Sequence, residues 1–547
     1  MASPKPTVHP KPYKFLPCLA LAVSGGLAQA LTLPKAGLWP LAFICLVPLY
    51  LAIANQTSKK AFFYGWIYGL ALGLFSFSWL AEVMGGYGGL GTGGGVVLVL
   101  LAAYLALYQG LWAYLMGPWL LNTANPYLVP ILGGALWTGL DWLKNFVFTG
   151  FNWTPLAVGL AAEPEMMGAA DLLGLYGLAL PVAAISGWLF FMVKNRVKAR
   201  PLLGFILGTL VYFCGYGSLT YKTWEKEVAS GYGLKIAVLQ ASVEQSMKWN
   251  VNYRDLILDR YSLLVAKAEL EKPWLIVWSE TAAPFSYGHD PIETAWLDNL
   301  LANSTAHSLV GVTRLEPKDG VYRLYNRAWL MGPNGPGPYY DKRHLVPFGE
   351  YVPLAKELPF LRWAFFQGVL GAAGRFSPGE KGAPLDHGGF RLGLMICFES
   401  TFPYLARDRV LEGANLLVVT TNDAWFGTSW APEQHLNQAA WRAVENRRPL
   451  VRAANNGISA NVSPSGRILA RSAQNEINAY IYAVPILRRE VFKLTIYARF
   501  GHYLPPILAI LTIIYLLYRF SKTIKFKNIK SKIDSSLKNT NLYPYNN

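Results

Sequence analysis

Charged residues are scarce in this chain of 547 residues, and acidic residues are the scarcer kind. Only 15% of the residues are charged and 53% are hydrophobic, whereas about 25% charged residues is usual for soluble domains. This composition argues against a wholly soluble protein and favours a chain with much of its length in a membrane. The formal net charge is +17. Because the basic residues form no compact patch with aromatic side chains, basic loops beside a membrane explain this charge better than nucleic-acid binding.

Cysteines are also few, and their placement excludes a disulfide framework. The chain has four, and none has a closely spaced partner. Cys18, Cys45 and Cys214 lie within apolar runs, where a thiol usually serves as a small apolar side chain. Cys397 differs, because it ends the apolar part of GLMICFES at 393–400 and is followed by an aromatic residue and a carboxylate. Cys397 is therefore the candidate nucleophile.

Long hydrophobic runs fill the first part of the chain and recur once near its end. Each is close to the ~20 residues that a helix needs to cross a bilayer. We predict about seven spans within residues 15–221 and a final span at 502–520; the first seven lie at 15–33, 36–54, 61–81, 96–116, 127–147, 168–193 and 202–219. The apolar stretch at 146–162 is either part of a span or a re-entrant or interfacial segment. The first run resembles a secretory signal ending at Ala28-Gln29-Ala30, but the spans that follow favour an uncleaved helix.

Basic loops predict the orientation of the chain. Lys59 and Lys60 follow the second span, and Lys194, Arg196, Lys198 and Arg200 follow the sixth. Together with the lysines of residues 1–14 and of the tail at 521–547, they fall on one side, which the positive-inside rule assigns to the cytoplasm. We therefore expect both termini inside, with a solvated, disordered tail, and the domain between the seventh and eighth spans outside.

That domain, residues 233–487, is predicted to have an α/β fold. Strand-like runs alternate with polar, helix-compatible stretches; the runs are LKIAVLQ (234–240), WLIVWSE (274–280), SLVGVTR (308–314), RLGLMICFE (391–399) and NLLVVTTND (415–423). Glu280 and Cys397 each end a run, at the edge where open α/β sheets usually bind ligands. Lys342 and Glu350 lie in the loop-like stretch YDKRHLVPFGEYVP.

A cysteine nucleophile needs a base to take its proton or a cation to hold its charge. Five histidines in the domain keep a Cys–His hydrolase open as one alternative: His289, His307, His344, His387 and His435. The other alternative combines Glu280 as base, Lys342 as oxyanion stabiliser and Cys397 as nucleophile. Taken singly, each of these three residues is more often a solvated charge or a packing residue. Their order and surroundings favour the second alternative.

In that order and context, Glu280, Lys342 and Cys397 resemble the nitrilase superfamily, with its Glu–Lys–Cys triad and α-β-β-α sandwich. The membrane spans on both sides narrow the resemblance to the apolipoprotein N-acyltransferase family. Further motifs resemble that family: LVPFGEYVP (345–353), TNDAWFG (421–427), RAVENRRPLVRAANNGISA (442–460) and Thr495-x-Tyr497-x-x-x-Gly501. In two departures, Ser242 stands where the family usually has asparagine, and DWLK at 141–144 stands where it tends to have Glu-Trp-Leu-Arg. Both bear on local substrate contacts more than on the reaction.

The resemblance implies a bacterial inner-membrane enzyme with a multi-span α-helical membrane domain and a nitrilase-like α/β catalytic domain on the periplasmic side. It implies transfer of an acyl chain from a phospholipid, through a Cys397 thioester, to the α-amine of the diacylglyceryl cysteine of a lipoprotein. Glu280 would be the base, and Lys342 would stabilise the oxyanion. No metal or cofactor is implied, and a domain held in the membrane at both ends is expected to be a monomer.

Three supporting residues are carried over from the same resemblance. The backbone N–H of Phe398 would complete the oxyanion site. Glu350 and Glu399 would orient the lysine or position the attacking amine.

Aromatic residues suggest where lipid could be held. We expect Trp249, Trp425 and Phe426 to contribute to an apolar arm or cleft, together with PFLRWAFFQGVLG at 359–371. A buried amphipathic segment is the equal alternative for 359–371.

Two other classes of protein compete with this interpretation. The first is a membrane-anchored nitrilase-type amidohydrolase, which would need only one anchor. The second is a transporter with an accessory domain, which would place charged residues at midspan. Asp141 and Lys144, the best candidates for such charges, lie near the end of their run.

Overall fold

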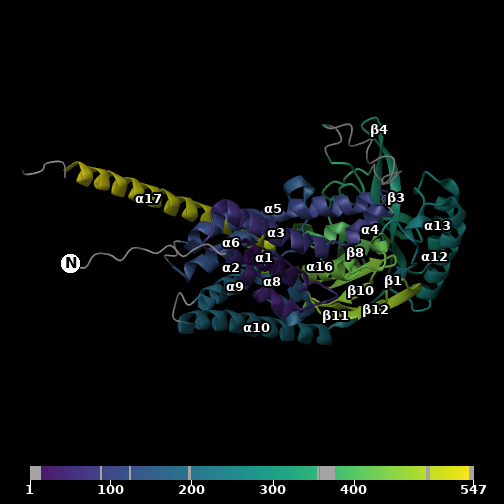
Figure 1. Cartoon of the computed structure of the whole chain (residues 1–547). Coiled ribbons are helices and arrows are strands. Elements are labelled where there is room, and N and C mark those ends of the chain that lie inside the picture. Colours follow the sequence, from purple (N-terminus) through teal and green to yellow (C-terminus); the bar gives the residue numbers. More distant parts are fainter. Residues whose placement is uncertain are drawn as a thin grey trace, which may run out of the picture.

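The computed structural model describes residues 14–86, 89–121, 125–194, 199–353, 357, 376–487 and 493–540. A helical domain occupies one end of the molecule and two β-sheets occupy the other (Figure 1). The helices of the first part are α1 (Phe15–Ala30), α2 (Leu46–Ile53), α3 (Ser58–Ser76), α4 (Trp79–Gly85), α5 (Gly93–Leu121), α6 (Leu128–Leu143), α7 (Pro164–Met167), α8 (Ala170–Gly177), α9 (Ala179–Val193) and α10 (Ala199–Ser230). The chain returns to this domain through α17 (Leu504–Thr540).

The helical domain is a multi-span membrane domain, as the sequence predicted. Among the described residues three helices, α5, α10 and α17, are long and apolar enough to cross a membrane. The count reaches five if two bent pairs, α3 with α4 (63°) and α8 with α9 (66°), each form one span. Shorter apolar helices lie at the remaining predicted spans, at Phe15–Ala30, Trp39–Ile53 and Leu128–Leu143. The number of crossings, eight from the sequence, stays a prediction.

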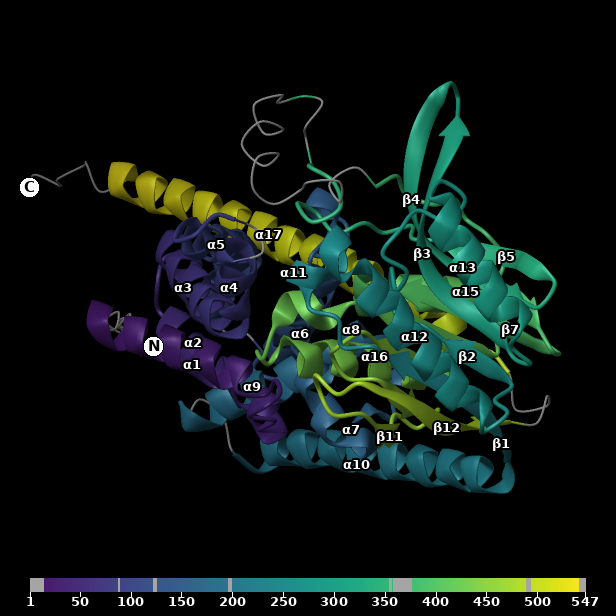
Figure 2. The same cartoon turned by 90° about the vertical axis from the view of Figure 1, so that its right-hand side faces the viewer.

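Two helices continue beyond the predicted spans. In both views α10 runs along the lower side of the molecule, and it extends to Ser230, where it leads directly into the first strand (Figure 2). Helix α17 continues to Thr540, well past Phe520, so most of the expected disordered tail is helical. The tail is rich in lysine, a good helix former, and adding residues to an existing helix avoids the cost of nucleating a new one.

The α/β domain contains two six-stranded sheets. The first has the order β12-β1-β2-β3-β4-β5 and the second β11-β10-β9-β8-β7-β6. Their bounds are β1 (Tyr232–Gln240), β2 (Leu275–Val277), β3 (His307–Lys318), β4 (Val321–Gly332), β5 (Gly335–Asp341), β6 (Leu385–His387), β7 (Phe390–Ile396), β8 (Leu416–Thr421), β9 (Leu450–Ala454), β10 (Ala460–Val462), β11 (Ile468–Arg471) and β12 (Asn478–Ile486). All five strand-like runs of the sequence are therefore confirmed, as β1, β2, β3, β7 and β8.

The sheets pack face to face between two helical layers. Apolar side chains from both sheets, including Val238, Val277, Leu394 and Val418, form one buried core between them. Helices α12 (Arg254–Glu269) and α13 (Pro291–Ala302) contribute to a core with the outer face of the first sheet. Helices α15 (Pro403–Leu411) and α16 (Ala431–Asn446) pack on the second. The predicted α-β-β-α sandwich is confirmed.

Helix α16 also joins the sandwich to the membrane domain. Trp441 Nε1 donates to Val158 O at 3.2 Å, and Leu175 N donates to Glu445 Oε1 at 2.9 Å. The ambiguous segment 146–162 holds two short 3-10 turns, Val147–Thr149 and Val158–Ala162, rather than one continuous helix. Hydrophobic side chains of this segment, of α16 and of the membrane helices share one core. The sandwich is therefore packed directly onto the membrane domain.

Candidate active site

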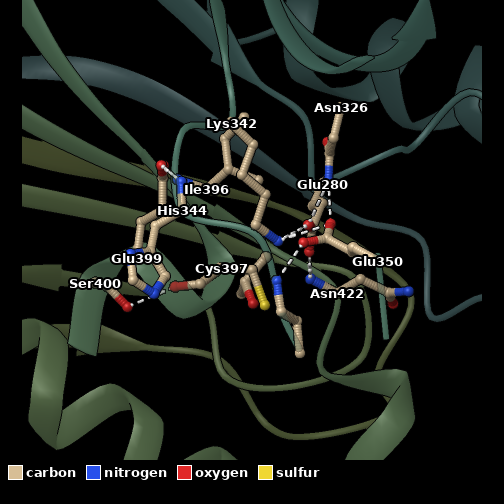
Figure 3. A network of polar contacts seen from close by, with 12 residues as sticks. Glu280, Asn326, Lys342, His344, Glu350, Ile396, Cys397, Glu399, Ser400 and Asn422 are labelled. Carbon is tan, nitrogen blue, oxygen red and sulfur yellow. Dashed lines mark hydrogen bonds and ion pairs between the residues drawn. The ribbon is translucent and has the colours of Figure 1, made fainter. Parts of the chain in front are cut away.

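Three loops that follow strands bring the predicted triad together (Figure 3). Glu280 follows β2, Lys342 follows β5 and Cys397 follows β7. The side chains of Lys342, Glu280 and Glu350 point toward one another, and the Cys397 sulfur lies beside them (Figure 3). Because β2 and β7 belong to different sheets, the site lies where the two sheets meet at their strand ends. The structure thus brings together residues far apart in the sequence, in the arrangement that the strand-end positions suggested.

The two carboxylates share the lysine ammonium. Lys342 Nζ donates to Glu280 Oε1 at 2.9 Å and to Glu350 Oε1 at 3.0 Å. Asn326 Nδ2 donates to the same two oxygens, at 2.8 and 3.0 Å. The other oxygen of Glu280 accepts from the backbone N–H of Asn422 at 2.9 Å, and Val346 N donates to Glu350 Oε2 at 2.8 Å. Each carboxylate is therefore fixed at both oxygens.

These contacts decide the charges of the resting site. Burial alone would raise the pKa of Glu280, but Lys342 beside it holds that pKa below the usual value. Burial would likewise lower the pKa of Lys342, but Glu280 and Glu350 raise it well above the usual value. Burial and the charge of Glu280 raise the pKa of the Cys397 thiol. At neutral pH the site therefore holds an ionised Glu280 carboxylate, a Lys342 ammonium ion and a protonated Cys397 thiol.

Cys397 sits on a sharp turn. It follows β7 directly, opens the short 3-10 segment Cys397–Thr401, and has a φ of +54°. A non-glycine residue in this left-handed region costs about 1–3 kcal/mol, and such residues cluster at active sites. No hydrogen bond among the described residues joins a histidine to the Cys397 sulfur, whereas His435 contacts its carbonyl oxygen. The Cys–His alternative therefore has no support in these contacts, and the role of Glu280 as the base stays a prediction.

Glu399 links the cysteine turn to the lysine loop. Its buried carboxylate accepts from the backbone N–H groups of Ile396 (2.7 Å), Arg343 (2.8 Å) and His344 (3.0 Å). Tyr340 Oη also donates to it, at 2.9 Å. Glu399 thus fixes the backbone just after the lysine and just before the cysteine, whereas Glu350 binds the lysine amine itself.

Sequence reasoning missed three residues of this site. Asn326 lies within β4, and nothing in its local sequence distinguishes it. Asn422 belongs to the TNDAWFG motif, which was noted without a role for that residue. Lys248 is 3% exposed and its Nζ donates to the backbone oxygen of Glu280 at 3.0 Å. The one signal for Lys248 in the sequence was its position next to Trp249, a predicted lipid-contacting residue.

The three aromatic residues predicted to hold lipid differ in exposure, and their role stays a prediction. Phe426 packs on Trp79 of the membrane domain, with ring centroids 4.9 Å apart. The ring centroid of Phe398, the residue after Cys397, lies 6.0 Å from that of Phe151 in the membrane domain. Trp249 is 47% exposed beside Lys248, and Trp425 is partly buried. The predicted arm at 359–371 lies outside the described residues.

Two family models together match most of the chain. The apolipoprotein N-acyltransferase N-terminal domain matches residues 25–189, and the carbon-nitrogen hydrolase domain matches residues 235–490. The first match covers most of the membrane helices, and the second covers the sandwich with the Glu280, Lys342 and Cys397 cluster.

Similar proteins are apolipoprotein N-acyltransferases over most of their length. The protein of that name from Geobacter metallireducens is 37% identical over 82% of this chain and 85% of its own. The one from Azotobacter vinelandii is 33% identical over 83% and 86%. Among solved structures, a carbon-nitrogen hydrolase from Helicobacter pylori is 18% identical, covers 46% of this chain and 89% of its own, and has a TM-score of 0.35.

Proposed function

This chain belongs to the apolipoprotein N-acyltransferase family, and we propose that it transfers an acyl chain from a phospholipid to a lipoprotein through a Cys397 thioester. Membership makes it an acyltransferase of the carbon-nitrogen hydrolase superfamily that acts in lipoprotein maturation. The acceptor would be the α-amine of an N-terminal S-diacylglyceryl cysteine. The observation that carries the proposal is the buried cluster in which Lys342 Nζ binds both Glu280 and Glu350 beside the Cys397 thiol.

In the first half-reaction Glu280 takes the proton from Cys397, and the sulfur attacks the sn-1 ester carbonyl of the phospholipid. The ammonium of Lys342 and the backbone N–H of Phe398 stabilise the oxyanion that forms. The ester C–O bond then breaks, the glycerol oxygen takes the proton from Glu280, and a lysophospholipid leaves. The charges found at rest suit these roles, since Glu280 is ionised and Lys342 is protonated.

In the second half-reaction the α-amine of the acceptor attacks the thioester carbon. Glu280 takes a proton from the nitrogen, the C–S bond breaks, and the Cys397 sulfur regains a proton as the amide is released. Glu350 holds Lys342 in place through both steps, because it accepts from the same amine as Glu280.

The surroundings of Cys397 support lipid substrates. Phe398 and the membrane-domain ring of Phe151 lie next to the nucleophile turn, so an acyl chain could approach from the bilayer side. The proposal is tested by incubating the purified protein with acyl-labelled phospholipid and a diacylated lipopeptide. Label in an amide on the peptide supports acyl transfer, whereas label released as free fatty acid would instead support a hydrolase.

The proposed location is the inner membrane, with the sandwich on the periplasmic side and a monomeric chain. We expect a periplasm-active reporter to be active when fused at Gly320, between β3 and β4, and inactive at Lys59, because basic loops stay inside. Matched fusions at these two positions, normalised to their expression, provide the measurement. If a second reporter, one that is active only in the cytoplasm, were active when fused at Gly320, the sandwich would lie inside. That result would contradict the proposed topology and the proposed access of the site to lipoproteins.

Lys248 supplies a further positive charge whose loss should slow acylation. Burial lowers the pKa of Lys248 to about 8, although Glu280 and Cys397 oppose the shift. The residue is therefore an ammonium ion below that pH, where it stabilises negative charge at the site, and becomes neutral above it. We expect Lys248→Met to slow single-turnover acylation about tenfold at pH 7, a loss equal in free energy to about one pKa unit. The deficit should shrink above pH 8, because the lysine of the wild type is itself neutral there.

Two controls interpret the Lys248 result. Lys248→Arg keeps the positive charge at every pH of the test, so this variant should retain above pH 8 most of the acylation rate that it has at pH 7. Lys235→Met removes an exposed lysine that pairs with Glu271 and should change nothing. A Lys248→Met deficit that is constant from pH 6 to pH 9 would mean that the residue acts by packing and not by charge.

A further inference from the structure

The backbone of Cys397 is held by a buried polar network that the reaction scheme above does not use. The Cys397 carbonyl oxygen accepts from Ser400 Oγ at 2.8 Å, and His435 Nε2 lies 3.1 Å from that carbonyl oxygen and 3.0 Å from Ser400 Oγ. A carbonyl oxygen can only accept a hydrogen bond. His435 therefore contributes to this contact only if Nε2 carries the hydrogen.

The far side of the His435 ring offers a donor that is compatible with that tautomer. Burial and the charge of Arg452 lower the pKa of His435, so the ring is neutral and has a single N–H. Arg452 Nη2 lies 3.1 Å from His435 Nδ1 and donates to Asp423 Oδ2 at 2.6 Å. Asp423 Oδ1, which accepts from Thr421 Oγ1 at 2.9 Å, also lies 3.1 Å from Nδ1 and would accept from it in the other tautomer. When Arg452 donates to Nδ1, the hydrogen is on Nε2, facing the Cys397 carbonyl and Ser400 Oγ.

The cysteine turn needs this support. A φ of +54° is strained for a residue other than glycine, and such a conformation persists only where the surroundings fix it. If the carbonyl of Cys397 were released, the turn could relax and move the sulfur away from Glu280. A misplacement of about 1 Å between reacting groups can cost about 100-fold in rate.

The ring of His435 is itself fixed from the membrane domain. Its centroid lies 5.5 Å from that of Trp153, whose Nε1 donates to Gln434 Oε1 at 2.7 Å. Gln438 Nε2 donates to Trp153 O at 2.8 Å, so one tryptophan is held by residues before and after His435 on α16. Packing between the membrane domain and α16 thereby reaches the nucleophile through one side chain.

We propose that His435 is a positioning residue for acyl transfer, which holds the carbonyl of Cys397 through Nε2–H while Arg452 and Asp423 orient the ring. The proposal rests on the proposed function for the reaction it serves, but the geometry it describes is independent of the substrate. It assigns His435 no proton transfer with the thiol, in contrast to a Cys–His hydrolase.

Two amide variants separate this role from simple packing. Glutamine can place an N–H near the position of Nε2, whereas the shorter asparagine reaches only the position of Nδ1. We expect His435→Gln to keep single-turnover acylation within about tenfold of the wild type and His435→Asn to lose about 100-fold. The same order is expected for alkylation of Cys397 by iodoacetamide, followed by peptide mass, which needs no lipid substrate. Thermal unfolding of both variants shows whether they fold alike.

A histidine far from Cys397 provides the matched control. His387 is the last residue of β6 and pairs with Phe390, at the end of β7 away from Cys397, so His387→Gln and His387→Asn should leave both rates unchanged. Equal loss, or no loss, in folded His435→Gln and His435→Asn would overturn the proposal. Alkylation that separates the two variants while even the wild type transfers no acyl chain would keep the positioning role and reject the proposed function.

Should His435→Asn fail to fold, Ser400→Ala gives the test, because it removes the other donor to the same carbonyl oxygen. A folded Ser400→Ala protein is expected to be alkylated and acylated about tenfold more slowly, because one of the donors that hold the Cys397 carbonyl is lost. Unchanged rates in that variant would overturn the proposal.

Discussion

Cys397→Ala and Cys397→Ser are expected to abolish acyl transfer and the covalent acyl adduct. The thiol is the only nucleophile placed beside both Glu280 and Lys342 in the described cluster, and a serine hydroxyl is far harder to deprotonate with a carboxylate base. After incubation with phospholipid, the wild-type protein should gain the mass of one acyl chain, which hydroxylamine removes. Intact-mass measurement in detergent provides the test.

The remaining cysteines provide the matched control. Cys18 and Cys45 are buried in the membrane domain, and Cys214 lies on α10. A triple variant, Cys18→Ala, Cys45→Ala and Cys214→Ala, should keep full acylation if it folds. An adduct that persists on Cys397→Ala would show that the nucleophile is misassigned.

Glu280→Gln and Lys342→Met should both slow thioester formation severely, but with different pH dependence. Loss of the base costs about 10²–10⁴ in rate, and loss of an oxyanion donor about 10²–10³. In Glu280→Gln the thiol must ionise by itself, so the rate should rise about tenfold per pH unit below the thiol pKa. Single-turnover acylation from pH 6 to pH 9 measures both variants against the wild type.

The contacts of Lys342 determine the second profile. Burial would raise the pKa of Glu280 and Lys342 opposes it, so Lys342→Met should raise that pKa and leave the base protonated at low pH. Its rate should therefore rise with pH only until Glu280 ionises, and then stay below the wild type because the oxyanion donor is gone. The same continuous rise in both variants would show that the base and oxyanion roles are not divided in this way.

The central strands could be predicted from the sequence because they are buried on both faces. β1, β2, β3, β7 and β8 read as nearly continuous apolar runs, as strands covered on both sides do. β5 and β6 lie at the edges of their sheets. β5 contains two prolines and β6 has only three residues, so neither has the pattern of a buried strand.

The triad could be predicted for a similar reason. Glu280 and Cys397 end apolar runs, and Lys342 stands in a motif that resembles a known family, so local sequence carried the signal. Asn326 and His435 acquire their roles only through packing. Asn326 lies on β4, between β3 and β5, and reaches Glu280 and Glu350 from there. His435 reaches the Cys397 carbonyl from α16. Such contacts depend on how distant segments pack, which the sequence around each residue does not reveal.

The most direct test of acyl transfer through Cys397 is a chase of the isolated acyl-enzyme. The protein is loaded from acyl-labelled phospholipid, separated from free lipid, and mixed with a diacylated lipopeptide that has a free α-amine. Label is expected to leave Cys397 and to appear as an amide on the peptide, at a rate at least equal to steady-state turnover, while an N-acetylated peptide accepts none. Label that stays on the protein, or that passes to water equally fast without the peptide, would contradict the thioester as the intermediate of transfer.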